Sequence, residues 1–258
     1  SGGPSNVATV ATSRMKLTLH KATHGCPMPR AVCGCFAGLL TEDDRKRAVG
    51  ILVDIFPGAK VTAFPDYAAA LKAGGADVDI CIVAGTGSLI CSMEAGRLHK
   101  AGGRGYLLGD YGSGFRLGQI ALMRLLDTPD LASPALKEQA MELFGSLDEA
   151  TVLSRVYRGG TAAATVAKLL PAFLKDLKAG LPYAVEGARG QMQKLAELTF
   201  GHATKHMKGK ELVKIGLAGG VWKASPEIRN LFSETINEVS QGSGTTFVTA
   251  RITEPPVS

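Results

Sequence analysis

The sequence is poor in aromatic residues, and no long hydrophobic run occurs in it. Aromatic residues make up 6% of its 258 residues, and no apolar run approaches the roughly 18 residues that a membrane-spanning helix needs. Residues 1–16 contain no apolar core of the kind found in secretory signals. We therefore expect a cytoplasmic protein with no membrane partner.

The basic residues are numerous but they are not clustered. The net charge is +6, whereas a nucleic-acid-binding domain usually shows a basic stripe together with aromatic residues. A solvated surface is the simpler interpretation, and a mild attraction for anionic small molecules such as ATP also fits. We expect no nucleic-acid partner.

Cysteine and histidine show no spacing that is typical of a metal site. The five cysteines are an odd number with no C-x-x-C pair, so we expect buried free thiols rather than disulfides or zinc ligands. Cys33 and Cys35 would share one face of a strand. His202 and His206 lie four apart on an expected helix without an H-E-x-x-H glutamate, which favours a solvated face over a metal site.

Strand and helix patterns alternate along much of the chain, which favours an α/β layer with a mostly parallel sheet. A helix capped by Thr41 and Asp44 would bury the face of Val49, Leu52, Val53 and Phe56. The segment 7–24 fits a strand or a helix equally well. Strands are expected over 31–37, 60–64, 79–84, 213–218 and 246–252, and a hairpin over 89–100. Helices are expected over 65–71, from Ser113, over 134–206 with breaks near 159–160 and 180–182, and from Ser225.

The glycine-rich stretch 80–118 contains the main candidates for a binding site. Gly85-Thr86-Gly87-Ser88 follows a strand, and its N–H groups and two hydroxyls could hold phosphate oxygens. A tight hairpin turn explains the motif equally well, and it is not a P-loop. Asp110 could brace a turn or form hydrogen bonds with a polyol.

Two further motifs lie where an expected strand meets a helix, which is where α/β sheets bind ligands. Asp66 would be a plain helix cap, or a carboxylate that accepts the proton of an attacking hydroxyl in phosphoryl transfer. Gly219-Gly220 would form a tight turn, or would let a purine ring lie against bare backbone.

Taken in order, these fragments resemble the N-acetylglucosamine kinase family and its relatives in the BadF/BcrA-type ATPase group. The resemblance covers nearly the whole chain and is most specific over 84–118. Its motifs are GGPSN at 2–6, CGCFAG at 33–38, DYAAA at 66–70, AGTGS at 84–88, GGRGYLLGD at 102–110 and GGVWK at 219–223.

The resemblance implies a two-lobed, actin-like ATPase (ribonuclease H-like) α/β fold that closes around ATP, Mg²⁺ and a small-molecule sugar. Asp66 would be the catalytic base, and no residue is assigned to the metal. The sugar-binding positions would be Asn6, Gly87, Ser88, Gly103, Arg104, Gly105 and Asp110. Gly85 and Thr86 would hold the ATP phosphates, and Ala167, Gly219 and Gly220 would lie near the adenosine.

Three features depart from the family pattern. A strand and a D-G-G-G-T phosphate loop usually precede the GGPSN motif, and a glycine-rich final helix usually follows the point where this chain ends. Arg104 and Tyr111 stand where Trp and Glu are common, and the second change bears on sugar recognition. Three explanations fit the absence of this strand and phosphate loop equally well. The sequence would be a fragment of a longer chain, a partner chain would supply the segment, or the protein would be a degenerate relative.

The interpretation that follows is an ATP-dependent sugar kinase acting on a hexose or amino sugar such as N-acetylglucosamine or glucosamine. Residues 1–78 would form a sugar-binding and catalytic lobe, incomplete at its N-terminus, and residues 79–258 a nucleotide-binding lobe. A homodimer is compatible with this interpretation. One alternative is a sugar-binding or regulatory relative without ATP turnover. A dehydratase-activating ATPase with an iron–sulfur cluster is disfavoured, because Cys33, Cys35 and Cys81 are expected in strand cores.

Overall fold

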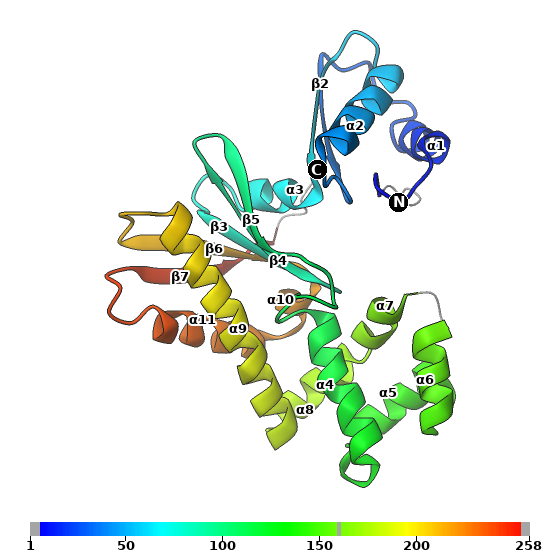
Figure 1. The fold of residues 1–258 in the computed structure, drawn as a ribbon, viewed down its shortest axis with the longest axis vertical. Coiled ribbons are helices and arrows are strands. Elements are labelled where there is room, and N and C mark those ends of the chain that lie inside the picture. The colour runs from blue at the N-terminus through cyan, green and yellow to red at the C-terminus, as the bar shows by residue number, and fades with distance from the viewer. Residues whose placement is uncertain (1–5, 159–160, 254–258) are drawn as a thin grey trace. The chain divides into compact units, whose positions relative to one another are not determined.

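The computed structural model describes residues 6–158 and 161–253. The chain separates into two compact units (Figure 1), of which unit 1 extends to Ala73 and unit 2 begins at Gly74. The catalytic and nucleotide-binding roles of the lobes remain predictions, as does the boundary after residue 78. The expected loop over 1–6 lies almost wholly outside the described residues.

Unit 1 contains a parallel pair of strands and three helices among its described residues. Its elements are α1 (Thr12–Ala22), β1 (Ala31–Phe36), α2 (Glu42–Ile55), β2 (Lys60–Pro65) and α3 (Asp66–Ala73). In the β1–β2 register Ala31 lies opposite Lys60, and Phe36 lies opposite Pro65. The segment that fitted either a strand or a helix is helical as α1, and it contributes Met15 to the core of this unit.

Helix α2 begins with the predicted capping box. The Thr41 hydroxyl accepts the Asp44 N–H at 3.1 Å, and the Asp44 carboxylate accepts the Thr41 N–H at 2.9 Å. The predicted apolar face is only partly right, because Leu52 is buried but Val53 is 45% exposed. Ile51 is buried instead, so the buried stripe is rotated slightly around the helix.

The expectation that Cys33 and Cys35 are core residues is wrong. Cys33 is exposed and Cys35 is only partly buried. Strand alternation turns Gly34 toward Leu52 of α2 and turns the two thiols to the opposite face, as their shared spacing predicted. Partial burial, together with the neighbouring Cys33, raises the pKa of Cys35 to about 11. Cys81 is buried, as expected.

The sheet of unit 2 has the strand order β5-β4-β3-β6-β7. Its strands are β3 (Ile80–Ala84), β4 (Ser88–Glu94), β5 (Arg97–Gly102), β6 (Leu212–Ala218) and β7 (Thr246–Arg251). Strands β3, β6 and β7 run parallel, whereas β4 and β5 form the predicted hairpin and pair antiparallel with their neighbours. We expected mostly parallel pairing, but in this sheet parallel pairing is confined to β3, β6 and β7.

Helices make up the rest of unit 2. They are α4 (Gly114–Asp127), α5 (Pro134–Phe144), α6 (Glu149–Arg158), α7 (Ala162–Ala167), α8 (Leu170–Lys178), α9 (Pro182–His206), α10 (Gly220–Ala224) and α11 (Pro226–Val239). Helices α9 and α11 pack on each other and against the sheet, while α4 contacts α7, α8 and α9 (Figure 1). The predicted break at 180–182 is confirmed, and the one at 159–160 lies outside the described residues. The break at Gly145 and the short α10 were not predicted.

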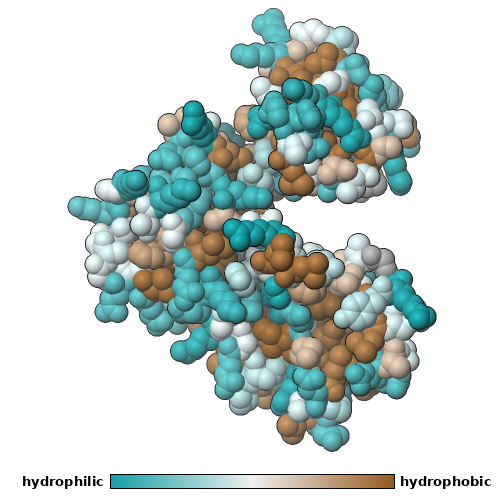
Figure 2. All heavy atoms as spheres, viewed as in Figure 1, coloured by the Kyte–Doolittle hydropathy of each residue, from teal (hydrophilic) through white to brown (hydrophobic). Residues whose placement is uncertain are grey.

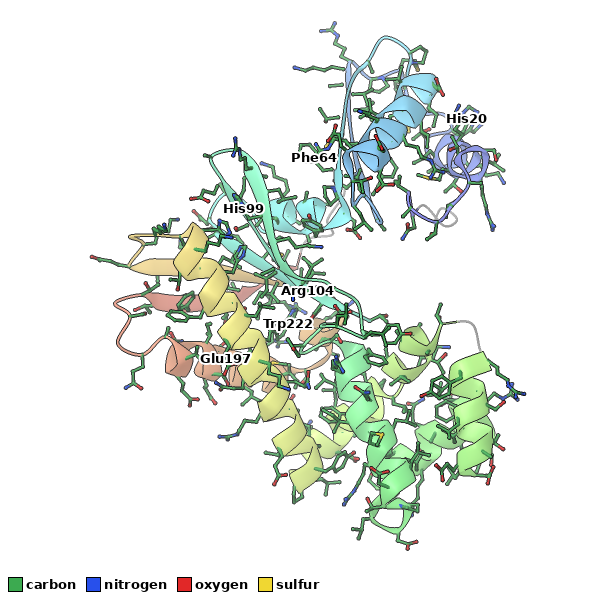
Figure 3. The ribbon with its side chains drawn as sticks, viewed as in Figure 1. His20, Phe64, His99, Arg104, Glu197 and Trp222 are labelled. Atoms are coloured by element: carbon green, nitrogen blue, oxygen red, sulfur yellow. The ribbon has the colours of Figure 1, made fainter. Side chains whose placement is uncertain are left out.

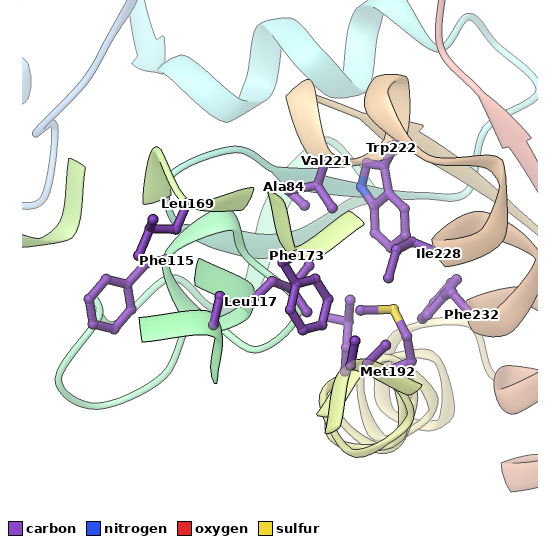
Figure 4. Close-up of a cluster of buried hydrophobic side chains, with 14 of the residues drawn as sticks. Ala84, Phe115, Leu117, Leu169, Phe173, Met192, Val221, Trp222, Ile228 and Phe232 are labelled. Carbon is purple, nitrogen blue, oxygen red and sulfur yellow. The ribbon is translucent and has the colours of Figure 1, made fainter. Parts of the chain in front are cut away.

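The core of unit 2 lies between the sheet and these helices. Trp222 of α10 is fully buried, and its indole N–H donates to the Ile82 carbonyl at 3.1 Å. Figure 4 shows Trp222 close to Ile228, with Phe232 and Met192 nearby in the same cluster. The interaction ties α10 to the central strand β3, and so fixes the turn that precedes α10.

The expected solvated face at His202 and His206 is also wrong. His202 is 5% exposed, and its Nε2 lies 2.8 Å from the hydroxyl of Ser92 in β4. The His206 side chain is 11% exposed. Both face the sheet because α9 packs across the β4–β5 hairpin, which a single helical spacing does not reveal.

Polar and apolar residues are interspersed on the face drawn in Figure 2. Among the described residues, no helix has both the length and the apolar character that would let it cross a bilayer.

Replacing Thr41 with Ala should loosen the start of α2. The change removes the hydroxyl that accepts the Asp44 N–H, and we expect it to cost about 1 kcal/mol. Hydrogen exchange of the α2 amides measures this locally. Thr9→Ala is the control, because Thr9 is exposed and its hydroxyl has no hydrogen bond to the described residues. Equal protection of α2 in both variants would contradict the capping role.

Candidate functional site

The turn at residues 85–87 joins β3 to β4 and is fastened to the start of α4. The Gly114 N–H donates to the Gly85 carbonyl at 2.7 Å, and the Phe115 N–H donates to the Thr86 carbonyl at 3.1 Å. The turn is thus the hairpin connection that we considered, and it is held rigidly in place. These bonds consume N–H groups of the helix, so the α4 N-terminus itself is not a free anion site.

The outer side of this turn remains open. Thr86 is exposed, and neither its hydroxyl nor its N–H donates a hydrogen bond to the described residues. A turn with a free N–H and hydroxyl can accept phosphate oxygens as hydrogen-bond partners. The geometry therefore satisfies both interpretations of the motif, because the hairpin turn presents the groups that a phosphate would need.

The other predicted nucleotide-binding residues meet at the same end of the sheet. Gly219 has a φ of 108°, and a Cβ there would lie 2.4 Å from the carbonyl oxygen of Ala84, the last residue of β3. Gly220 has open space at the corresponding position. Ala167, at the end of α7, lies 3.6 Å from where a Cβ on Gly114 would stand. The turn, α10 and α7 thus surround the carboxyl ends of β3 and β6.

Next to this turn lies a cavity of about 190 Å³, which we call the Asp110 cavity. Its lining residues are Val83, Gly87, Ser88, Leu89, Gly103, Gly105 and Asp110. Five of these seven are predicted sugar-binding residues, which the structure therefore brings together. Pockets for drug-sized ligands are usually about 300–1,000 Å³, so this cavity suits a smaller molecule.

Backbone contacts hold the walls of the Asp110 cavity at fixed distances. The Gly103 N–H donates to the Ser88 carbonyl at 3.1 Å, and the Ser88 hydroxyl donates to the Tyr111 carbonyl at 2.7 Å. Gly87 is required by close approach, because a Cβ there would stand 2.6 Å from Oδ2 of Asp110. Tyr111 itself is not among the residues that line this cavity.

Asp110 is the buried acid of this cavity. It is 7% exposed and has a φ of 61°, a left-handed conformation that Asp tolerates better than most residues. Burial raises the pKa of Asp110, while the nearby backbone N–H groups of Ser88 and Gly105 and the charges of Arg116 and Lys100 oppose that rise.

The remaining predicted residues lie apart from the cavity lining. Arg104 is exposed on the segment after β5 (Figure 3) and borders a smaller cavity of about 60 Å³ that also reaches Asp110. Asn6 and Asp66 belong to unit 1. The Asn6 amide oxygen accepts the Ala8 N–H at 3.0 Å, and Asp66 is an exposed residue at the start of α3 whose carboxylate accepts the Tyr67 N–H at 3.0 Å.

Sequence reasoning missed two kinds of participant. Val83 and Leu89 form an apolar wall of the cavity, because the pairing of β3 with β4 sets them opposite each other. Arg116 donates its Nε–H to the Gly109 carbonyl at 3.0 Å and faces Asp110. Arg116 could not be predicted, because nothing in the neighbouring sequence indicates that a residue in the first turn of α4 lies near Asp110.

Comparison with known proteins places this geometry in a known fold. No protein-family model and no curated protein sequence matches the chain. A solved structure of a candidate N-acetylglucosamine kinase from Porphyromonas gingivalis superposes with a TM-score of 0.70 at 19% identity, over 95% of this chain and 81% of that one. A second such candidate, from Chromobacterium violaceum, gives 0.67 at 21% identity, over 96% and 84%.

A ROK family glucokinase from Streptomyces griseus, solved with glucose and AMPPNP, gives a TM-score of 0.54 at 16% identity, over 96% of this chain and 84% of that one. At such low identities the similarity establishes the fold and no more. The expected actin-like α/β fold, shared with sugar-kinase structures of this group, is confirmed.

Gly219 and Gly220 offer a matched pair for testing how the turn before α10 is built. Gly219→Ala should destabilise unit 2 by about 2–3 kcal/mol, because its Cβ meets backbone and its φ is positive. Gly220→Ala should be neutral or stabilising by up to about 1 kcal/mol. The single tryptophan, Trp222, reports unfolding of unit 2 by fluorescence. Equal stabilities of the two variants would contradict the close approach of Gly219 to β3.

Proposed function

We propose that this protein is an ATP-dependent sugar kinase that transfers the γ-phosphoryl group to a hexose or amino sugar of the N-acetylglucosamine or glucosamine kind. The observation that supports this most is the arrangement around Ser88. A turn with free polar groups directly precedes it in the chain, and Ser88 also lines a cavity that contains a buried carboxylate. Phosphoryl donor and polyol acceptor need these two environments next to each other.

The Asp110 cavity has the chemistry for holding a sugar. A carboxylate has about four acceptor positions. Those of Asp110 can accept sugar hydroxyls, and hydrogen bonds to a charged group are stronger than neutral ones. Glycines at 87, 103 and 105 leave room for a sugar ring to approach the backbone.

The nucleotide fits the groups around the carboxyl end of β3. Thr86 would hold the phosphates through the open side of the turn. Gly85 would lie beside them, because its own N–H already donates to the Gly87 carbonyl at 2.9 Å. Ala167, Gly219 and Gly220 offer small residues against which adenosine can lie. Bound Mg²⁺-ATP supplies the phosphoryl group and the charge neutralisation that this reaction requires. No residue of the chain is assigned to the Mg²⁺ itself.

Asp66 would be the general base that takes the proton from the attacking sugar hydroxyl. Its position at the start of α3 directs a carboxylate from the end of β2, and one of its oxygens already accepts the Tyr67 N–H. A base in this role needs accessible lone pairs, and Asp66 is exposed. Asn6 and Arg104 complete the proposed sugar contacts.

Replacing Asp66 with Asn should lower kcat while leaving sugar binding intact. Loss of a general base typically costs about 10²- to 10⁴-fold in rate, and the amide keeps the shape of the side chain. A coupled ADP-release assay with ATP, Mg²⁺ and a panel of hexoses and amino sugars measures it. The control is Asp77→Asn, an exposed carboxylate outside both sites. Full activity of Asp66→Asn would remove the assigned base, and sugar binding without any turnover by the unaltered chain would support a non-catalytic relative.

Replacing Asp110 with Asn should weaken sugar binding about 10- to 100-fold, because hydrogen bonds to a charged acceptor are lost. Stability should change little. Burial raises the pKa of Asp110, so its ionised form opposes folding above that pKa, and the opposition is relieved as pH falls or when a neutral amide replaces the acid. Calorimetry with glucosamine, N-acetylglucosamine and glucose measures the affinity, with Asp127→Asn as an exposed control. Unchanged affinity in Asp110→Asn would contradict the role of the cavity.

A further inference from the structure

The far end of the β4–β5 hairpin carries a cluster that the proposed kinase chemistry does not use. Glu94 is the last residue of β4, His99 lies on β5, and His206 is the last residue of α9. Figure 3 shows His99 on the hairpin beside the end of α9. Three separate elements of unit 2 therefore bring one carboxylate and two imidazoles to one point.

The three side chains converge through the atoms that bind metals. One carboxylate oxygen of Glu94 lies 3.0 Å from Nδ1 of His206 and 3.4 Å from Nε2 of His99. The ligand atoms of all three residues lie within 4.8 Å of one another. The two imidazole rings stack with centroids 4.0 Å apart, so both present their edges to the same carboxylate.

These separations match what a single metal ion requires. Zinc binds imidazole nitrogen and carboxylate oxygen at about 2.0–2.2 Å. Neighbouring ligands of a tetrahedral or octahedral ion therefore stand about 3.0–3.5 Å apart, from those bond lengths and angles. The two distances to the Glu94 oxygen already fall in this range, so an ion could bind with small side-chain movements.

The surroundings also favour a built site over a chance meeting of surface groups. The His206 side chain is 11% exposed and that of His99 27%, whereas Glu94 is 49% exposed and leaves a route for an ion to enter. Behind them, the buried His202 ring lies 4.7 Å from that of His206 and is held by the Ser92 hydroxyl. One opposing feature is Lys208, whose charge acts on Glu94.

We propose that Glu94, His99 and His206 form a binding site for a divalent transition-metal ion such as Zn²⁺, with water completing the coordination. Two imidazoles and one carboxylate are typical ligands for zinc and its neighbours, whereas Mg²⁺ prefers oxygen alone. A bound ion would fasten the tip of the hairpin to the end of α9. Glu94 lies six residues beyond Ser88 along β4, about 20 Å from the cavity at that end, so this site is separate from the Mg²⁺-ATP of the proposed reaction.

Calorimetric titration of the chelator-stripped, full-length chain with ZnCl₂ tests this, with MgCl₂ as the comparison ion. We expect one Zn²⁺ per chain, no Mg²⁺ at this site, and a visible cobalt spectrum on substitution with Co²⁺. At a Zn²⁺ concentration 100 times Kd, the Tm should rise by about 5 °C or more. Neither readout depends on kinase activity, so failure of the kinase proposal leaves this test intact.

Two variants and one control locate the ion. Glu94→Gln and His206→Ala should each weaken Zn²⁺ binding by at least about 10- to 100-fold. Mutating a residue that only supports a metal ligand already causes a loss of this size. His24→Ala, which removes an exposed histidine of unit 1, should bind as the unaltered chain does. Thermal melting in the presence of chelator identifies any variant that fails to fold. If His206→Ala fails to fold, the test rests on Glu94→Gln, which keeps the shape of the side chain. Absence of Zn²⁺ binding, or binding that Glu94→Gln leaves unchanged, would overturn the proposal.

Discussion

A buried carboxylate stands at the centre of the part of this protein on which the proposed function depends. Asp110 lines the same cavity as Ser88 at the start of β4 and as Gly103 and Gly105 of the segment that follows β5. An ionised group in such a place is costly unless it is hydrogen-bonded, and its left-handed backbone adds strain of the kind that concentrates at functional sites. Gly87 follows from this constraint, because a Cβ there would stand 2.6 Å from the Asp110 carboxylate.

The β4–β5 hairpin gives unit 2 two chemically different ends. Near Ser88 it adjoins a turn with open polar groups and the Asp110 cavity, which suit a phosphate and a polyol. Near Glu94 it meets the end of α9 with imidazole and carboxylate groups, which suit a softer metal ion. Helix α9 packs against both strands, so the two ends share one rigid support while they remain about 20 Å apart.

Local patterns were enough to predict much of this fold. The Thr41 capping box, the Ser113 cap and the hairpin after Ser88 all depend on neighbouring residues, and all are present. Long-range packing accounts for what the patterns missed. Nothing near Cys33 in the sequence shows that its face of β1 is poorly covered, and nothing near His206 shows that Glu94 and His99 lie opposite it. The family resemblance named five of the residues that line the Asp110 cavity, while the apolar wall of Val83 and Leu89 depends on the pairing of β3 with β4.

Hydrogen exchange with ligands present tests the central claim most directly, which is that the turn before Ser88 and the Asp110 cavity hold different parts of a phosphoryl-transfer pair. On adding a nonhydrolysable ATP analogue with Mg²⁺, we expect slower exchange at residues 85–87 and 219–220. On adding an amino sugar alone, we expect slower exchange at 103–110. Unchanged exchange in both segments at saturating ligand, or protection confined to other parts of the chain, would contradict it.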